Sequence, residues 1–169
     1  MSPEAKVAPN PGAAADGDFM PSFLETLALV ERLHRLLLDV VKDEFERLGI
    51  IDINSVQALL LFNVGDHEVT AGELRSRGYY QGSNVSYNLK KLVDCGYMHH
   101  QKCTVDRRAV RVRLTDKGRK IWAIMDGLFR RQAEGLHERE ALGDVRLADI
   151  NRSLRALERF WSDQIRYIY

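Results

Sequence analysis

The sequence predicts a mainly α-helical protein with a small antiparallel β-hairpin. Apolar residues recur at steps of three and four over most of residues 22–168, which is the period of an α-helix. Strict alternation of apolar and polar residues, typical of a half-buried strand, occurs near residues 109–115. No proline follows Pro21, so long helices can form without a break. The 169 residues suffice for one domain with a sizeable core.

Residues 1–20 are expected to be a disordered N-terminal tail. All four prolines of the chain fall within the first 21 residues, beside an alanine-rich stretch that offers little surface to bury. Residues 21–169 are then expected to form a single domain.

Two long helices are expected at the ends of this domain, over residues 22–49 and 144–168. The first carries two apolar stripes and stops at Gly49, and the second follows an expected N-cap at Asp144. A helix in a small monomer normally keeps one polar face towards water, and an apolar C-terminal helix would fray without cover. Both helices are therefore predicted to form the interface of a homodimer.

Three shorter helices are expected between residues 54 and 96. The signals are two capping pairs and one terminating glycine: Asn54 with Gln57, Thr70 with Glu73, and Gly96. The last of the three is expected over residues 83–95. Three short helices with a brief turn before the last have the layout of a helix-turn-helix.

A basic β-hairpin is expected directly after the third short helix. Residues 97–104 form one expected strand, and residues 109–115 form the other, with apolar and arginine side chains on opposite faces. A basic hairpin in this position is a wing, so residues 54–118 are predicted to form a winged helix-turn-helix. A helix over residues 116–140 is expected to connect it to the last helix.

The distribution of charge indicates a polyanionic partner. The formal net charge of the chain is only +1. Residues 71–120, however, hold 12 Lys and Arg against 4 Asp and Glu, a local charge of +8, while the rest holds 13 basic and 20 acidic residues and carries −7. Segregation of this kind concentrates positive potential on one region. Together with the helix-turn-helix layout, it points to double-stranded DNA.

The candidate DNA-binding surface combines the third short helix with the tip of the hairpin. Apolar residues share the inward face of that helix, so its outward face can read base edges with amides and hydroxyls and hold phosphates with lysines. An arginine on a slim hairpin can enter a narrow minor groove, and Asp106 can orient it by a charge-assisted hydrogen bond. The candidate residues are Ser83, Asn84, Ser86, Tyr87, Lys90, Lys91, Asp106, Arg107 and Arg108.

Other functions have less support in the sequence. No nucleophile with a base, phosphate-binding loop or carboxylate pair stands out, so neither an enzyme nor a cofactor is expected. The cluster of Cys95, His99, His100 and Cys103 has no spacing typical of a tetrahedral metal site. A winged module that binds protein instead of DNA is an alternative, which the basic charge of residues 71–120 disfavours. Neither a signal peptide nor a membrane-spanning run is recognisable, so a cytoplasmic location without membrane contact is expected.

The hairpin and the helix before it resemble the MarR family of bacterial transcriptional regulators. Residues 106–118 are similar to the family's wing, from an Asp-x-Arg tip to a Leu-Thr-x-x-Gly exit, and residues 85–92 are similar to its recognition helix. By this resemblance Arg108 is the minor-groove arginine and Ser86 a recognition-helix contact. The chain departs from the family pattern at Tyr87, where many members have arginine.

The resemblance also implies how such a protein works. Family members are triangular homodimers whose first and last helices interlock, and they repress nearby genes until a small-molecule effector relieves repression. Two wings related by a two-fold axis require an inverted-repeat operator. Residues 83–93 further resemble the LdtR-like branch, which is associated with cell-envelope and stress genes. The family's oxidant-sensing branch has its cysteine in the first helix, where this sequence has none.

Overall fold

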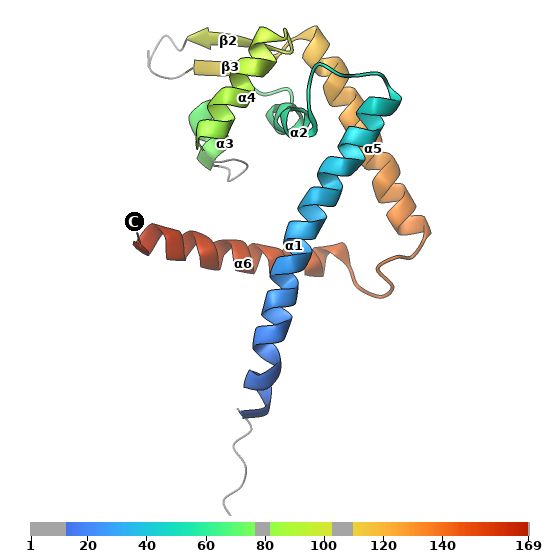
Figure 1. The fold of residues 1–169 in the computed structure, drawn as a ribbon, viewed down its shortest axis with the longest axis vertical. Helices are drawn as coiled ribbons and strands as arrows, with labels where there is room; N and C mark the ends of the chain where they lie inside the picture. Colours follow the sequence, from blue (N-terminus) through green and yellow to red (C-terminus); the bar gives the residue numbers. More distant parts are fainter. Residues whose placement is uncertain (1–12, 77–81, 103–109, 169) are drawn as a thin grey trace, which may run out of the picture. The chain divides into compact units, whose positions relative to one another are not determined.

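The structure, a computed structural model, describes residues 13–76, 82–102 and 110–168 (Figure 1). These ranges contain six helices and three short strands. In chain order they are α1 (Ala13–Arg47), α2 (Ser55–Val64), β1 (Val69–Thr70), α3 (Ala71–Ser76), α4 (Gly82–Asp94), β2 (Met98–Lys102), β3 (Val110–Leu114), α5 (Asp116–Glu138) and α6 (Leu147–Ile168). The mainly α fold with a small antiparallel wing is confirmed.

The chain divides into two compact units, residues 1–125 and residues 126–169, with the boundary inside α5. The first unit contains the short helices and the sheet, and its core draws on each of these elements. The largest fully buried side chains are those of Val41, Leu60, Leu61, Val64, Val69, Leu74, Val85, Leu92, Met98, Val112 and Met125. None of the described helices is both long enough and apolar enough to cross a membrane.

The sheet has the strand order β1-β3-β2, with both pairings antiparallel. The hairpin β2–β3 matches the two expected strands, and Met98 pairs with Leu114 at its base. Strand β1 was not expected. It consists of only two residues, and Val69 pairs with Val112 far along the chain, so no local pattern announces it.

Local capping signals predict the ends of the short helices well. Asn54 and Gln57 form a reciprocal capping box at the start of α2, with N–H···O distances of 2.9 and 3.1 Å. Thr70 and Glu73 do the same for α3. Helix α4 ends in a left-handed Gly96 with φ +74°, and the residue after it returns a hydrogen bond to the helix.

Two expected helix starts are wrong. Helix α1 begins at Ala13, so the expectation of a disordered tail fails for residues 13–20, and Pro21 lies inside the helix. Three consecutive alanines open this helix, and alanine has the highest helix propensity of all residues. Helix α6 begins at Leu147, so Asp144 is not its N-cap; Asp149 in the first turn instead pairs with Arg146.

Candidate nucleic-acid interface

Helix α4 presents a polar outer face opposite an apolar inner one. On the inner face Val85, Leu89 and Leu92 are buried. The predicted contacts Asn84, Ser86, Tyr87, Lys90 and Lys91 are all exposed. The Tyr87 ring is 62% exposed. The backbone of Ser83 lies in α4, but its side chain is outside the described residues.

The two lysines of α4 differ in their electrostatic surroundings. The Lys90 ammonium lies 2.8 Å from the Asp94 carboxylate one turn further on, and this hydrogen bond raises the pKa of Lys90 above its ordinary value. Lys91 has no ion-pair partner among the described residues. Lys91 is therefore the more available of the two for an external anion.

Asn88 is a buried polar residue of α4 that the sequence analysis did not select. Its side-chain oxygen accepts a hydrogen bond of 3.3 Å from Gln57 on α2, and its amide nitrogen donates to the Asn84 carbonyl at 2.9 Å. Asn88 thus fixes α4 against α2 and does not belong to the outer face. Its partner Gln57 is also a member of the α2 capping box.

The wing follows α4 as predicted, although its tip is outside the described residues. In β3, Val112 and Leu114 are buried while Arg111 and Arg113 are exposed, which confirms the predicted alternation. Arg111 lies 3.5 Å from Glu68. The predicted contacts Asp106, Arg107 and Arg108 fall within residues 103–109, which the structure does not describe.

The base of the wing is joined tightly to the end of α4. The Thr115 hydroxyl donates to the Gly96 carbonyl at 2.7 Å, and the Thr115 backbone N–H donates to the Tyr97 carbonyl at 3.0 Å. The same hydroxyl accepts from the Gly118 N–H at 3.0 Å and so caps the start of α5. The end of α4, the start of β2 and the start of α5 therefore meet at one point.

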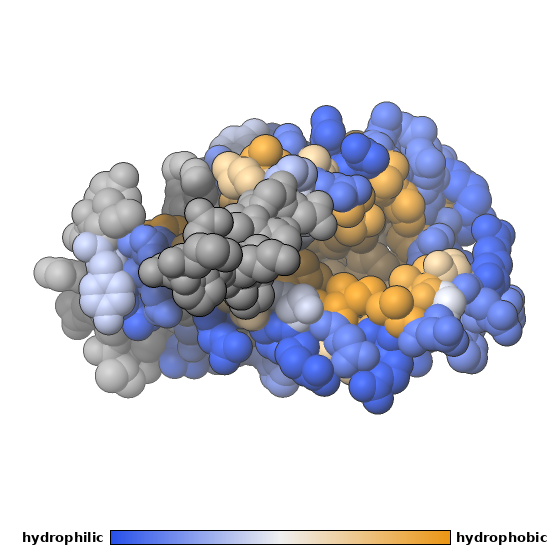
Figure 2. Space-filling view, turned by 90° about the horizontal axis from the view of Figure 1, so that it is seen from below, coloured by the Kyte–Doolittle hydropathy of each residue, from blue (hydrophilic) through white to orange (hydrophobic). Residues whose placement is uncertain are grey.

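The terminal helices expose many large apolar side chains. On α1, Leu33 is 62% exposed, and on α6, Ile165 is 63% exposed. The remaining exposed apolar residues of these two helices are Phe19, Met20, Leu24, Leu29, Val30, Leu36, Leu37, Leu147, Leu154, Phe160, Trp161 and Tyr167. Figure 2 shows apolar residues, in orange, at the surface of the molecule. Surfaces of this extent mark interaction sites in soluble proteins.

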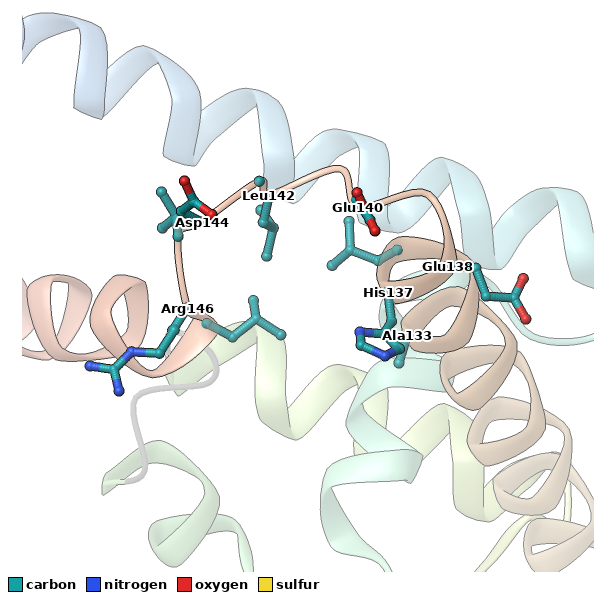
Figure 3. Close-up of a pocket in the computed structure, with 11 residues that line it drawn as sticks. Ala133, His137, Glu138, Glu140, Leu142, Asp144 and Arg146 are labelled. Carbon is teal, nitrogen blue, oxygen red and sulfur yellow. The ribbon is translucent and has the colours of Figure 1, made fainter.

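A cavity of about 770 Å³ lies in the second unit, where the end of α5 turns towards α6 (Figure 3). Its lining mixes aliphatic side chains, among them Leu136 and Leu147, with charged ones. Leu142 points into the cavity, whereas Glu138 and Arg146 point away from it (Figure 3).

Of the four residues of the cysteine and histidine cluster, Cys95, His99 and His100 lie within the described ranges. His99 and His100 are consecutive in β2, so they lie on opposite faces of the strand. Cys103 is outside the described residues. No group of three or more His, Cys, Asp or Glu that could hold a metal ion occurs among the residues described.

Comparison with known proteins places this geometry among DNA-binding proteins. Residues 53–118 match the family model of a winged helix DNA-binding domain. The chain is 35% identical over 156 residues to the exopolysaccharide II synthesis transcriptional activator ExpG of Rhizobium meliloti (strain 1021), and the match covers 90% of this chain and 78% of that protein.

Two solved structures share the fold over nearly their whole length. A MarR transcriptional regulator from Methanosarcina mazei Go1 superposes with a TM-score of 0.60 and 22% identity, covering 86% of this chain and 98% of that one. FabT of Streptococcus pneumoniae, in complex with DNA, gives a TM-score of 0.58 and 22% identity, covering 84% of this chain and 99% of that one.

Proposed function

The chain belongs to the MarR family of winged-helix transcriptional regulators, and from this premise we propose that it acts as a homodimer on an inverted-repeat operator. The observation that carries the proposal is the exposed polar face of α4, which lies opposite a buried apolar face and directly precedes a basic wing. In this role α4 lies in the major groove and the wing beside the minor groove.

The predicted contacts have different roles in DNA binding. Asn84, Ser86 and Tyr87 read base edges, because amides, hydroxyls and apolar edges depend on the base presented. At least one of Lys90 and Lys91 holds a phosphate and sets the register, with Ser83 at the start of the helix. At the tip Arg108 enters the minor groove, beside Arg107 and oriented by Asp106.

The homodimer is supported by the exposed apolar side chains of α1 and α6. Helix α6 spans 22 residues and has an exposed Trp161 close to its C-terminal end. A partner subunit that covers this helix removes the cost of exposing it to water. Sedimentation at micromolar concentration is expected to give about twice the chain mass of 19.4 kDa. A folded, stable monomer would contradict the proposed assembly.

Repression relieved by a small-molecule effector is the expected mode of regulation, on the family resemblance. The relative ExpG is named an activator, so whether this chain represses or activates transcription has to be measured. Transcription from an operator-bearing promoter is expected to fall when the protein is added and to recover with effector. A rise on addition of protein would assign activation instead. The cavity between α5 and α6 is the place where we expect the effector to bind.

Selection of bound duplexes from a random pool tests the function directly. The selected sites are expected to have dyad symmetry, with half-site centres about 10 base pairs apart. Arg108→Ala is expected to cost about 1–3 kcal/mol of binding free energy at such a site, most with A·T-rich flanks. Salt-independent or absent duplex binding would favour the alternative of a winged module that binds protein. A cytoplasmic location is part of the same proposal.

A further inference from the structure

Beyond the end of α4, three segments distant in sequence meet around one ammonium group. The Lys117 Nζ, in the first turn of α5, lies 2.8 Å from the Asp52 carboxylate in the loop between α1 and α2. It also donates to the Cys95 carbonyl at 3.0 Å and lies 4.0 Å from the centre of the Tyr97 ring. The Tyr97 hydroxyl donates to the other Asp52 oxygen at 2.5 Å.

The charges of this cluster are fixed at neutral pH. Hydrogen bonds from Lys117 and Tyr97 lower the pKa of Asp52, and the hydrogen bond to Asp52 raises the pKa of Lys117. Burial, together with the hydrogen bond to Asp52, raises the pKa of Tyr97 to about 12. A carboxylate, an ammonium and a neutral phenol therefore coexist, joined by charge-assisted hydrogen bonds.

Lys117, although part of α5, contacts the C-terminal end of α4. The last carbonyls of a helix lack intrahelical partners and carry the negative end of the helix dipole. Cys95 directly follows α4, and the Lys117 ammonium donates a hydrogen bond to its carbonyl. The same ammonium is anchored on Asp52, so the end of α4 is tied to a loop that precedes α2.

The ion pair itself adds little to folding stability. The side chains of Lys117 and Asp52 are 49% and 44% exposed, and exposed pairs of this kind contribute little because water and salt screen them. A contact that adds little to folding stability but restricts the orientation of a DNA-binding helix affects the binding affinity. Restricting that orientation before DNA arrives lowers the ordering cost of binding.

We propose that Asp52 and Lys117 are positioning residues that hold α4 and the base of the wing in the orientation required by the operator. In this proposal both residues act through α4 and the wing and not by contacting DNA. The inference rests on the proposed DNA-binding function and extends it to a pair that sequence reasoning did not select.

The test uses the full chain and a matched pair of α5 variants, Lys117→Met and Lys120→Met. Each removes one positive charge from α5, but Lys120 is exposed and has no partner among the described residues. Lys117→Met is expected to weaken operator binding about tenfold more than Lys120→Met, with equal effects of the two on random duplex. Lys117→Arg is expected to restore most of the operator affinity, because it keeps the charge and the donors.

Two further measurements separate positioning from folding. Asp52→Asn combined with Lys117→Met is expected to lose no more operator affinity than Lys117→Met alone, since both act through one contact. The melting temperatures of Lys117→Met and Lys120→Met are expected to agree within error. Equal losses on operator and random duplex would overturn the inference, as would a fall in melting temperature that accounts for the lost affinity. A wild-type chain that binds no duplex at all would instead overturn the proposed function, and the inference with it.

Discussion

Gly118 lies against the backbone of Tyr97 so closely that a Cβ at Gly118 would be 2.1 Å from the Tyr97 carbonyl oxygen. That carbonyl also accepts the Thr115 N–H, so it cannot move away without losing a hydrogen bond. The Leu-Thr-x-x-Gly sequence at the exit of the wing therefore has a structural meaning. Its threonine joins α5 to the end of α4, and its glycine lets the two backbones approach.

Gly118→Ala is expected to lower the free energy of unfolding by about 2 kcal/mol, because the obstructing atom is backbone and cannot rotate away. Gly135 lies in the same helix with no atom within 4 Å of an added Cβ. Gly135→Ala is expected to raise the free energy of unfolding by about 0.5–1 kcal/mol, since alanine favours the helix. Urea denaturation of both variants checks the contrast. Similar effects of the two substitutions would refute the close approach.

Asn88 and Asn84 lie one turn apart on α4 but are expected to respond oppositely to substitution. Asn88→Ala leaves the buried Gln57 amide without its acceptor, so the free energy of unfolding is expected to fall by about 1–3 kcal/mol. Asn84→Ala removes an exposed side chain and is expected to change stability by less than about 0.5 kcal/mol.

Selection of bound duplexes from a random pool compares the base preferences of Asn84→Ala and Asn88→Ala. Asn84→Ala is expected to alter base preference at a discrete position of the operator, as a base-reading residue should. Asn88→Ala is expected to keep the preference of the wild type in the fraction that remains folded. A changed preference with Asn88→Ala and none with Asn84→Ala would exchange the roles of the two residues.

Features that depend on neighbouring residues could be predicted from the sequence, and those that depend on distant contacts could not. The capping box of Asn54 and Gln57 and the left-handed Gly96 each involve residues within one or two turns, so the sequence displays them directly. The alternating face of β3 is equally local. The helix order, the wing and the exposed face of α4 follow from such signals.

The burial of Asn88 depends on the hydrogen bond that it accepts from Gln57, 31 positions away in the sequence. The pair of Asp52 and Lys117 spans 65 positions. Charge type alone cannot distinguish such pairs from ordinary solvated side chains, which is why the sequence selected the outer face of α4 and the wing tip but neither of these pairs. The start of α1 at Ala13 was missed because proline content was weighed above alanine propensity.

Tyr97 is expected to make folding stability depend on pH in the alkaline range. Its pKa is about 12 in the folded protein and about 10 in an unstructured chain. The folded state thus holds the phenol proton more tightly, so this contribution is complete below about pH 10 and is lost as the pH rises through about 12. The difference in free energy of unfolding between wild type and Tyr97→Phe is expected to shrink over that interval.

Urea denaturation at several values of pH between about 9 and 12 measures this difference. Comparison with Tyr97→Phe cancels the titration of the other tyrosines and of the lysines that do not contact Tyr97. A difference that stays constant over the whole interval would show that Tyr97 titrates at its ordinary pKa.

Lys90 and Lys91 are expected to contribute unequally to the salt dependence of DNA binding. A lysine that neutralises a phosphate releases a counterion, so its removal lowers the slope of log affinity against log salt by about one unit. Lys91 has no ion-pair partner among the described residues, whereas the Lys90 ammonium lies 2.8 Å from Asp94. Lys91→Ala is therefore expected to reduce the slope by about one unit, and Lys90→Ala by clearly less.

Asp94→Asn provides the decisive control, because it releases Lys90 while leaving both lysines in place. This variant is expected to bind random duplex more tightly than wild type, since it removes a negative charge near DNA and frees an ammonium for phosphate. Lys90→Ala in the Asp94→Asn background is then expected to reduce the slope by about one unit, as Lys91→Ala does in the wild type. Titrations of random duplex at four or more salt concentrations measure each slope. Identical slopes for Lys90→Ala with and without Asp94 would show that the ion pair of α4 does not compete with DNA.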